Sequence, residues 1–360
     1  AIVHERTPHP MRQSRRKILL VDNELTISGA SLMLFSLAEH LISQGYALDI
    51  AAVSSKDGAL RARYEAIGAV LPEQLNAEDY ALCIANTIFS AQLVTAISSQ
   101  VKTIWWIHEA DNGFQVALGD PQLYLNAFLL AHKIVFPVAR LRDDIYRSFL
   151  YPLTPAKVAI VANGIQLDEQ ITPIEHSELF RIVSVATIDM RKRQGDILEA
   201  VEKLNDPDIE VILVGQKNQL SAAGERVLQL DQARDNKRYH LLGPLEHEAA
   251  MRWLTSADIL VHPASVETQP LAPLEAATLG IPMVLTSLDV YHGIWRHGEN
   301  CLMHGVGDIE LLAEMIHALK RNRILASRLA AQAQMTAQQF TRASFLRDFD
   351  QVINGLLGAA

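Results

Sequence analysis

The sequence predicts an α/β protein of two domains, each built on a mostly parallel, doubly wound sheet. Its 360 residues suffice for two domains of about 150 residues each. In both halves, short apolar runs alternate with stretches of helical spacing, which is the pattern of strands and helices in βαβ units. With 49% hydrophobic and 20% charged residues, the chain can bury two cores and is not disordered.

The first series of elements opens with a β-α-β unit whose first turn contains glycine. After that turn, at 25–30, apolar residues recur with helical spacing over 31–44, and Gly45 stands where a helix ends in a left-handed conformation. Short apolar runs predict strands at 17–22, 48–53, 81–85, 103–107, 133–136 and 158–161.

A second series follows a linker expected at 168–177. Apolar runs predict five more strands, at 181–185, 210–214, 239–242, 258–261 and 282–285. From 309 to 360 the sequence favours helix throughout. The chain therefore divides into two similar α/β domains.

Charge and motif content exclude several classes of protein. A net charge of −9 argues against nucleic acid as a partner. Cys83 and Cys301 are too few for a disulfide framework, and no spaced Cys/His set offers a structural zinc site. The absence of Gly-x-Gly-x-x-Gly, Walker A, His-Glu-x-x-His and Gly-x-Ser-x-Gly motifs disfavours dehydrogenases, P-loop nucleotidases, zincins and serine hydrolases. No apolar stretch reaches the ~18 residues that span a bilayer, and the polar first ten residues resemble no signal peptide, so we expect a cytoplasmic protein.

The most informative segment is 262–282, which follows a buried strand and opens a short helix ending at Gly280. Free amides at the start of this helix would face the carboxyl end of the sheet, where helix N-termini favour phosphate. These amides belong to Thr268, Gln269 and Leu271, beside Pro270. Glu267 and Glu275 flank them, and because carboxylates repel phosphate, their natural partners are sugar and ribose hydroxyls. The pattern thus fits a nucleotide sugar. The same sequence would also arise if Glu267 were an N-capping acid and Glu275 a surface glutamate.

These residues resemble a known family. The spacing Pro263-x3-Glu267-x7-Glu275-Ala-x3-Gly280-x-Pro is similar to the signature of retaining nucleotide-sugar glycosyltransferases with the GT-B fold, glycosyltransferase family four of group 1 type. The resemblance covers nearly the whole chain, through further similar stretches at 28–31, 105–109, 161–165, 188–196 and 293–302. It implies an acceptor domain at 17–168, a donor domain at 178–338, a cleft between them, and a C-terminal helix at about 340–360 that packs back on the first domain.

The resemblance also implies roles for individual residues. Glu267 would hold the transferred sugar and Glu275 the ribose diol, while Lys192, with Arg191, would stabilise the leaving diphosphate without a metal or other cofactor. His108 would contact the transferred sugar or a developing charge. Other donor contacts are expected at Thr187, Gly243 and Pro244, beside Thr268, Gln269, Pro270 and Leu271. Acceptor or phosphate contacts are expected at Ser28, Gly29, Ala30, Ser31, Asn86 and Glu109.

Each of these assignments has a structural alternative. Arg191 and Lys192 could form a solvated basic turn, and 28–31 an ordinary turn between strand and helix. His108 could be a satisfied core histidine, and Asn86 a helix cap. The sequence also departs from the family, because many relatives carry an arginine where this chain has Ala186, leaving Arg191 or backbone amides to contact that phosphate.

Two other classes of function stay open at this point. One is a GT-B enzyme of another type, a nucleotide-sugar epimerase or an inverting transferase. The other is a nucleotide-sugar-binding protein without turnover. Within the favoured class, UDP is the expected carrier ahead of GDP and dTDP, and the expected acceptor is a saccharide or glycolipid in polysaccharide or glycoconjugate biosynthesis. The sugar, the oligomeric state and a peripheral membrane association stay open.

Overall fold

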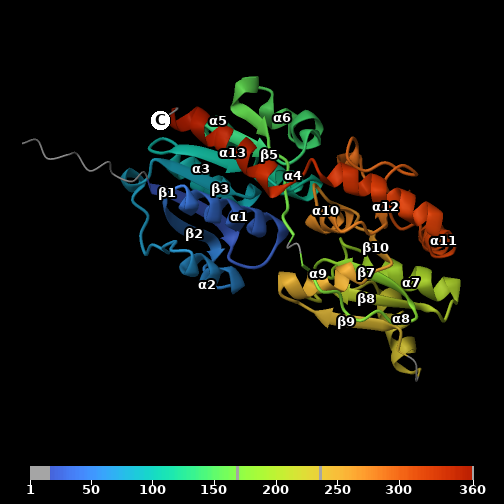
Figure 1. Ribbon diagram of the computed structural model, residues 1–360. Helices are drawn as coiled ribbons and strands as arrows, with labels where there is room; N and C mark the ends of the chain where they lie inside the picture. The colour runs from blue at the N-terminus through green and yellow to red at the C-terminus, as the bar shows by residue number, and fades with distance from the viewer. Residues whose placement is uncertain (1–16, 168–169, 235–236, 359–360) are drawn as a thin grey trace, which may run out of the picture. The chain divides into compact units, whose positions relative to one another are not determined.

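The computed structural model describes residues 17–358 except 168–169 and 235–236. The first ten residues and Asp168, the first residue of the expected linker, therefore lie outside the described residues. Within them the chain forms two six-stranded parallel sheets with helices on their faces (Figure 1). The predicted α/β class with two doubly wound sheets is confirmed.

The first sheet has the strand order β2-β1-β3-β4-β5-β6. Its strands are β1 (Lys17–Glu24), β2 (Ala47–Ser55), β3 (Leu82–Asn86), β4 (Lys102–Trp106), β5 (Lys133–Phe136) and β6 (Val158–Ile160). The helices between them are α1 (Gly29–Ser43), α2 (Ala59–Ala66), α3 (Ala91–Ile97), α4 (Asp111–Gly119), α5 (Pro121–Leu130) and α6 (Arg147–Leu150). Helix α1 is bounded by local signals, because the Ser28 side chain accepts a hydrogen bond from the Ser31 amide at its start and Gly45 takes φ +86° after its end.

The second sheet has the strand order β12-β11-β10-β7-β8-β9. Its strands are β7 (Phe180–Val185), β8 (Ile209–Val214), β9 (Tyr239–Gly243), β10 (Ile259–His262), β11 (Met283–Thr286) and β12 (Leu302–His304). The helices are α7 (Gln194–Leu204), α8 (Ala222–Gln232), α9 (His247–Thr255), α10 (Leu271–Thr278), α11 (Ile309–Arg321), α12 (Arg323–Ala337) and α13 (Arg342–Leu357). Strand β12 was not expected from the sequence, since three residues are too few to show a strand pattern.

Two apolar clusters bury the two faces of the second sheet. Successive strand residues alternate between them, so that Ile182 joins the cluster under α7, α8 and α11, whereas Val183 joins the cluster under α9 and α10. Both faces are therefore covered, as a parallel sheet requires. This leaves the carboxyl ends of the strands, rather than a face, to present functional side chains.

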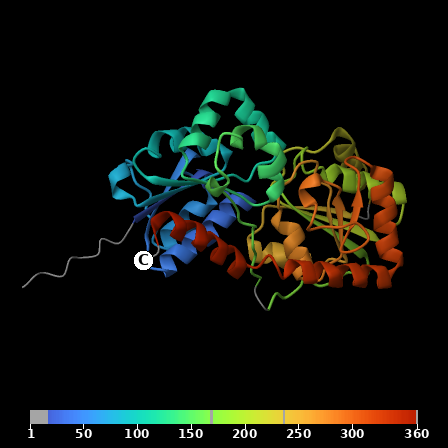
Figure 2. The ribbon, with the colours of Figure 1, turned by 90° about the horizontal axis from the view of Figure 1, so that it is seen from above.

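The chain divides into two compact units. The first unit contains the described residues of Ala1–Trp106, Asn126–Ile134 and Asn354–Ala360, and the second unit contains those of Ile107–Leu125 and Val135–Ile353. Helix α13, the red helix nearest the marked C-terminus in Figure 2, contributes residues to both units. The second unit thus holds the whole second sheet, together with α4 and the segment that follows β5.

Backbone and side-chain contacts hold the start and the end of α13. In the second unit, Ile165 N–H donates to the Phe340 carbonyl over 2.9 Å, and Gly164 lies so close to Thr341 that a Cβ there would be 2.1 Å from its carbonyl oxygen. In the first unit, the Lys102 ammonium donates to the carbonyl of Leu356 over 2.5 Å. Any side chain at 164 would therefore displace the segment that leads into α13.

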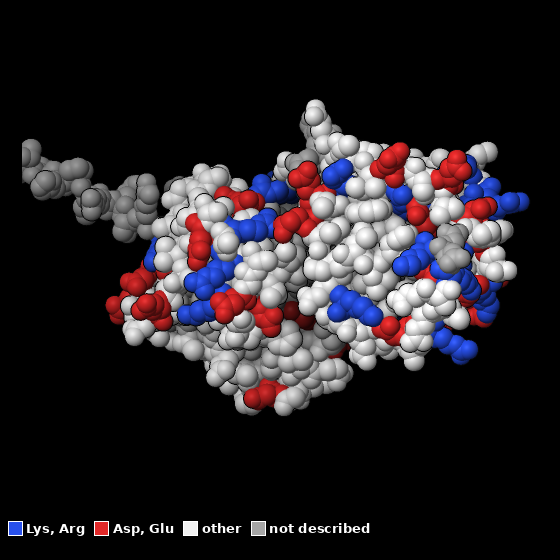
Figure 3. All heavy atoms as spheres, turned by 90° about the horizontal axis from the view of Figure 1, so that it is seen from below, with Lys and Arg blue, Asp and Glu red and all other residues white. Residues whose placement is uncertain are grey.

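Two surface properties bear on partners. Within the described residues, no helix combines the length and apolar character needed to cross a bilayer. On the face drawn in Figure 3, basic and acidic side chains are interspersed and form no broad field of one sign. That face therefore lacks the positive field that draws nucleic acid.

Candidate active site at the carboxyl end of the second sheet

Lys192 and Glu267 form a buried ion pair at the carboxyl end of the second sheet. The Lys192 ammonium donates to Glu267 Oε1, and the same oxygen lies 2.8 Å from Nε2 of His262, the last residue of β10. The side chains of Lys192 and Glu267 are 14% and 7% exposed. A solvated basic turn therefore does not describe Lys192, although it does describe Arg191, which is exposed.

This arrangement keeps Glu267 ionised. Burial acts to raise the pKa of the carboxyl, but the Lys192 charge and the His262 hydrogen bond outweigh it and lower the pKa of Glu267 to about 2. Burial in turn lowers the pKa of His262, and Glu267 opposes that shift only in part. At neutral pH the site therefore presents a carboxylate that can accept hydrogen bonds from sugar hydroxyls.

The loop that carries Lys192 is organised by Asp189. One Asp189 oxygen accepts from the Lys192 backbone amide over 2.8 Å, and the other lies 3.6 Å from the Arg191 guanidinium. Ser265 ties this loop to the segment after β10, since its amide and hydroxyl both donate to the Arg191 carbonyl, over 2.8 and 3.0 Å. The two segments of the predicted donor site thus lie side by side.

The start of α10 is held from the segment after β6. Gln269 Oε1 accepts from the Asn163 amide over 2.7 Å, and the Asn163 side chain donates to the Gln269 carbonyl over 3.0 Å. Pro270 is the N-cap of α10, Leu271 its first residue, and Thr268 is half-buried beside them. The Gln269 side chain, to which sequence reasoning gave no role, fixes the loop whose amides are expected to meet phosphate.

Glu275 lies inside α10 and is also buried. Its Oε1 is 2.8 Å from Nε2 of His247, the first residue of α9, whose side chain is 47% exposed. Glu267 lies three residues before the N-cap and caps nothing, and Glu275 is not on the surface. The alternative of an N-capping acid plus a surface glutamate is therefore wrong.

The remaining predicted donor contacts surround the same strand ends. The Thr187 carbonyl accepts from the Gln194 side chain over 3.0 Å, Gly243 ends β9 with φ +74°, and Pro244 is exposed. Ala186 can form no ion pair or side-chain hydrogen bond, because its side chain is a methyl group. Of the cations in the 186–192 segment, Lys192 alone is buried against Glu267.

The first unit gathers its predicted residues around the end of β1. Asn86 donates through its side chain to Asp22 Oδ1 and to the carbonyl of Ala30, over 3.2 Å each. Ser28 caps α1, Gly29 begins it, and the Ser28 hydroxyl donates to Ser31 Oγ over 2.9 Å. Asn86 thus links the end of β1 to the first turn of α1 rather than acting simply as a cap.

Burial raises the pKa of Asp22, although hydrogen bonds from Ser31 and Asn86 oppose the shift. Its second oxygen, Oδ2, is buried with no hydrogen-bond partner. Sequence reasoning missed Asp22, whose place as the last residue of the apolar run before the turn was the only available signal.

His108 follows β4 and belongs to the second unit. It is buried, and desolvation lowers the pKa of its imidazole to about 3. The Glu109 carboxylate accepts from the backbone amide of His108 over 3.1 Å. At neutral pH His108 is therefore a neutral imidazole, able to donate one hydrogen bond but carrying no charge.

This pKa leads to a prediction about stability. The unfolded state binds a proton on His108 near pH 6.5 and the folded state only near 3, so stability falls as pH decreases through that window. We expect His108→Gln to reduce the slope of the free energy of unfolding against pH by up to about 1.4 kcal/mol per pH unit. Urea unfolding at several pH values measures this slope. His292→Gln, at an exposed histidine, is the control. An unchanged slope in His108→Gln would contradict the assigned burial.

A hollow of about 300 Å³ opens on Glu267. Its lining residues all belong to the second unit. They include Ser265 and Asp289, which follow strands of the second sheet, and Asp111 and Arg140, which follow β4 and β5 of the first sheet. Among the described residues, no group of three or more His, Cys, Asp or Glu side chains is placed to hold a metal. Asp-x-Asp, a common metal-nucleotide motif, occurs in the described residues at 206–208, in the loop between α7 and β8, and at 348–350, in α13.

Comparisons with known proteins agree with this geometry. The family model described as glycosyl transferases group 1 matches residues 168–336, and that described as glycosyl-transferase family 4 matches residues 14–120. HepE from Anabaena, solved with UDP and glucose, superposes with a TM-score of 0.76 at 18% identity over 94% of this chain and 99% of that one. Sucrose-phosphate synthase from Thermosynechococcus elongatus superposes with a TM-score of 0.72 at 17% identity over 96% and 100%.

A curated relative is similar in sequence. The alpha-monoglucosyldiacylglycerol synthase of Acholeplasma laidlawii is 20% identical over 242 residues, which are 63% of this chain and 58% of that protein. The two six-stranded parallel sheets match the GT-B fold of these solved structures, and the family models place the chain among the nucleotide-sugar glycosyltransferases of that fold. The chain belongs to the group 1 glycosyltransferases of glycosyltransferase family 4.

Proposed function

We propose that the protein transfers a sugar from a UDP-linked donor to the hydroxyl of a saccharide or glycolipid, with retention of the anomeric configuration. The observation that carries this proposal is the buried Lys192–Glu267 pair beside the start of α10. A cation and helix amides attract a diphosphate, while an ionised carboxylate between them attracts hydroxyls. The UDP and glucose bound to HepE, and the lipid named in the Acholeplasma laidlawii relative, support a UDP-sugar donor and a glycoconjugate acceptor.

Each residue has a part in this reaction. Lys192 stabilises the negative charge that develops on the leaving diphosphate, which lowers the barrier because that charge is greatest in the transition state. Glu267 holds hydroxyls of the transferred sugar, and Glu275, positioned by His247, holds the ribose diol. The leaving phosphate itself takes the acceptor proton, so that the mechanism assigns no general base to the protein.

A thermal-shift screen tests the proposed donor. UDP-glucose, UDP-galactose, UDP-N-acetylglucosamine and GDP-mannose are added separately, and a ligand at 100 times its Kd should stabilise the fold by about 2.7 kcal/mol. We expect a UDP-sugar to give the largest shift. A shift with GDP-mannose alone would refute UDP as the carrier, and no shift with any nucleotide sugar would refute the proposed function.

The proposed phosphate site needs no divalent metal, because Lys192 and the amides before α10 supply positive charge. We therefore expect donor affinity and transfer to be unchanged after EDTA treatment. Calorimetry of UDP binding with EDTA or with added Mg²⁺ measures this directly. Loss of binding or transfer on chelation would show that a metal carries the charge assigned to Lys192.

A further inference from the structure

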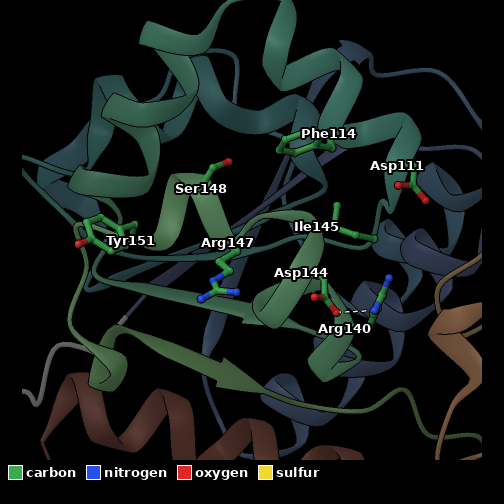
Figure 4. A pocket seen from close by; sticks show the side chains of 8 residues that line it. All are labelled: Asp111, Phe114, Arg140, Asp144, Ile145, Arg147, Ser148 and Tyr151. Atoms are coloured by element: carbon green, nitrogen blue, oxygen red, sulfur yellow. Dashed lines mark ion pairs between the residues drawn. The ribbon is translucent and has the colours of Figure 1, made fainter.

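A second hollow adjoins the one that opens on Glu267. It measures about 710 Å³ and lies between α4, α6 and the turn before α6 (Figure 4). Three residues line both hollows, namely Asp111, Arg140 and Ile145. Since both hollows belong entirely to the second unit, a ligand in the larger one can reach toward the bound sugar through this shared border.

The walls of the larger hollow suit a sugar ring. Phe114 is half-buried and held edge-on against Tyr146 and Phe149, with ring centroids 5.9 Å apart in each pair. Tyr151, also in the wall, is 89% exposed. A fixed and an exposed aromatic ring offer apolar surfaces on which a sugar face can pack, next to polar groups for its hydroxyls.

The charges in this hollow are divided between its two ends. Arg140 is neutralised by Asp144 at 2.6 Å and by Asp289 at 3.1 Å. Asp111, at the border with the Glu267 hollow, accepts no hydrogen bond through its carboxylate from the described residues. It is therefore available to acceptor hydroxyls close to the reacting centre.

Arg147 carries the charge at the other end. The nearby Arg142 pairs with Asp143 at 2.6 Å, but the Arg147 guanidinium makes no ion pair or hydrogen bond with the residues that the structure describes. Figure 4 shows the Arg147 side chain apart from Asp111. An unpaired guanidinium in a sugar-sized hollow is a site for a carboxylate or a phosphate.

We propose that this hollow binds the acceptor and selects a saccharide that carries an acid group, with the acid on Arg147 and a hydroxyl at Asp111. The inference rests on the proposed function and adds the chemical class of the acceptor. The acid is a sugar carboxylate or a phosphate, because both match the same guanidinium.

The test compares matched probes on the UDP-loaded protein by ligand-observed NMR titration. Methyl glucuronide and methyl glucoside differ only in a carboxylate, and glucose 6-phosphate and glucose only in a phosphate. We expect one acidic probe to bind about fivefold more tightly than its neutral counterpart. This gain in affinity is smaller than that of a buried charged hydrogen bond because the hollow is open to solvent. The preferred pair identifies the acid as carboxylate or phosphate, and the preference should shrink as salt is added.

Arg147→Gln should abolish this preference, while Arg142→Gln, at an arginine outside the lining, should keep it. UDP affinity is measured in each variant and should not change. Three outcomes would overturn the acceptor proposal in a protein that still binds UDP. They are equal affinity for acidic and neutral probes, no measurable binding of any probe, and a preference for the acidic probe that is unchanged in Arg147→Gln. Failure of the unmodified protein to bind UDP would overturn the proposed function itself.

Discussion

Lys192→Met is expected to lower turnover by about 10²- to 10³-fold, the loss found when one preorganised group that stabilises transition-state charge is removed. Methionine keeps much of the volume of the lysine stem but has no charge. The variant leaves Glu267 buried with only His262 as its partner, so its carboxyl pKa should rise and the fold should lose stability. Turnover is therefore expressed per folded molecule, with the folded fraction measured by circular dichroism.

Lys203→Met is the matched control, because Lys203 pairs with Glu310 on the surface and both side chains are more than half exposed. It should change stability by less than about 1 kcal/mol and leave turnover intact. If Lys192→Met retained most of its turnover per folded molecule, the leaving diphosphate would have to be stabilised by another group.

Substitution of the two buried glutamates, Glu267 and Glu275, by glutamine is expected to affect UDP affinity and sugar transfer differently. Glu275→Gln should weaken UDP binding by about 1.5–3 kcal/mol, because its proposed partner is the ribose and the lost bond is charge-assisted. Glu267→Gln should leave UDP affinity nearly unchanged and reduce transfer, because its proposed partner is the transferred sugar, which UDP lacks. Calorimetry with UDP and a transfer assay with the full donor separate the two effects.

Glu225→Gln provides the control, since Glu225 forms a half-exposed pair with Lys217. It should alter neither measurement. Equal losses of UDP affinity in Glu267→Gln and Glu275→Gln would refute the division of roles between the two carboxylates.

Much of this architecture could be predicted from the sequence because it depends on local periodicity. All eleven expected strands are present, and the left-handed glycines Gly45 and Gly280 end their helices where expected. Strand β12 was not predicted because it is three residues long and follows a segment typical of a loop. The helical tail is broken at Asn322, whose side chain accepts from the Leu325 amide and so starts a new helix.

The partners of the site residues were harder to predict. The Glu267 motif placed a carboxylate at a strand end, but His262, His247 and Asn163 lie 5, 28 and 106 residues from the groups that they contact. Such pairs depend on how loops from different strands meet, which periodicity does not record. Only His262, a polar residue ending an apolar strand just before the motif, offered a signal.

One-dimensional proton NMR of donor turnover measures whether the proposed transfer retains the anomeric configuration. The protein is incubated with UDP-glucose and water as the only acceptor, and the anomeric signals of released glucose are followed from the first minutes. We expect α-glucose to appear first and β-glucose to accumulate later by mutarotation. Initial release of β-glucose would contradict retention and indicate an inverting enzyme.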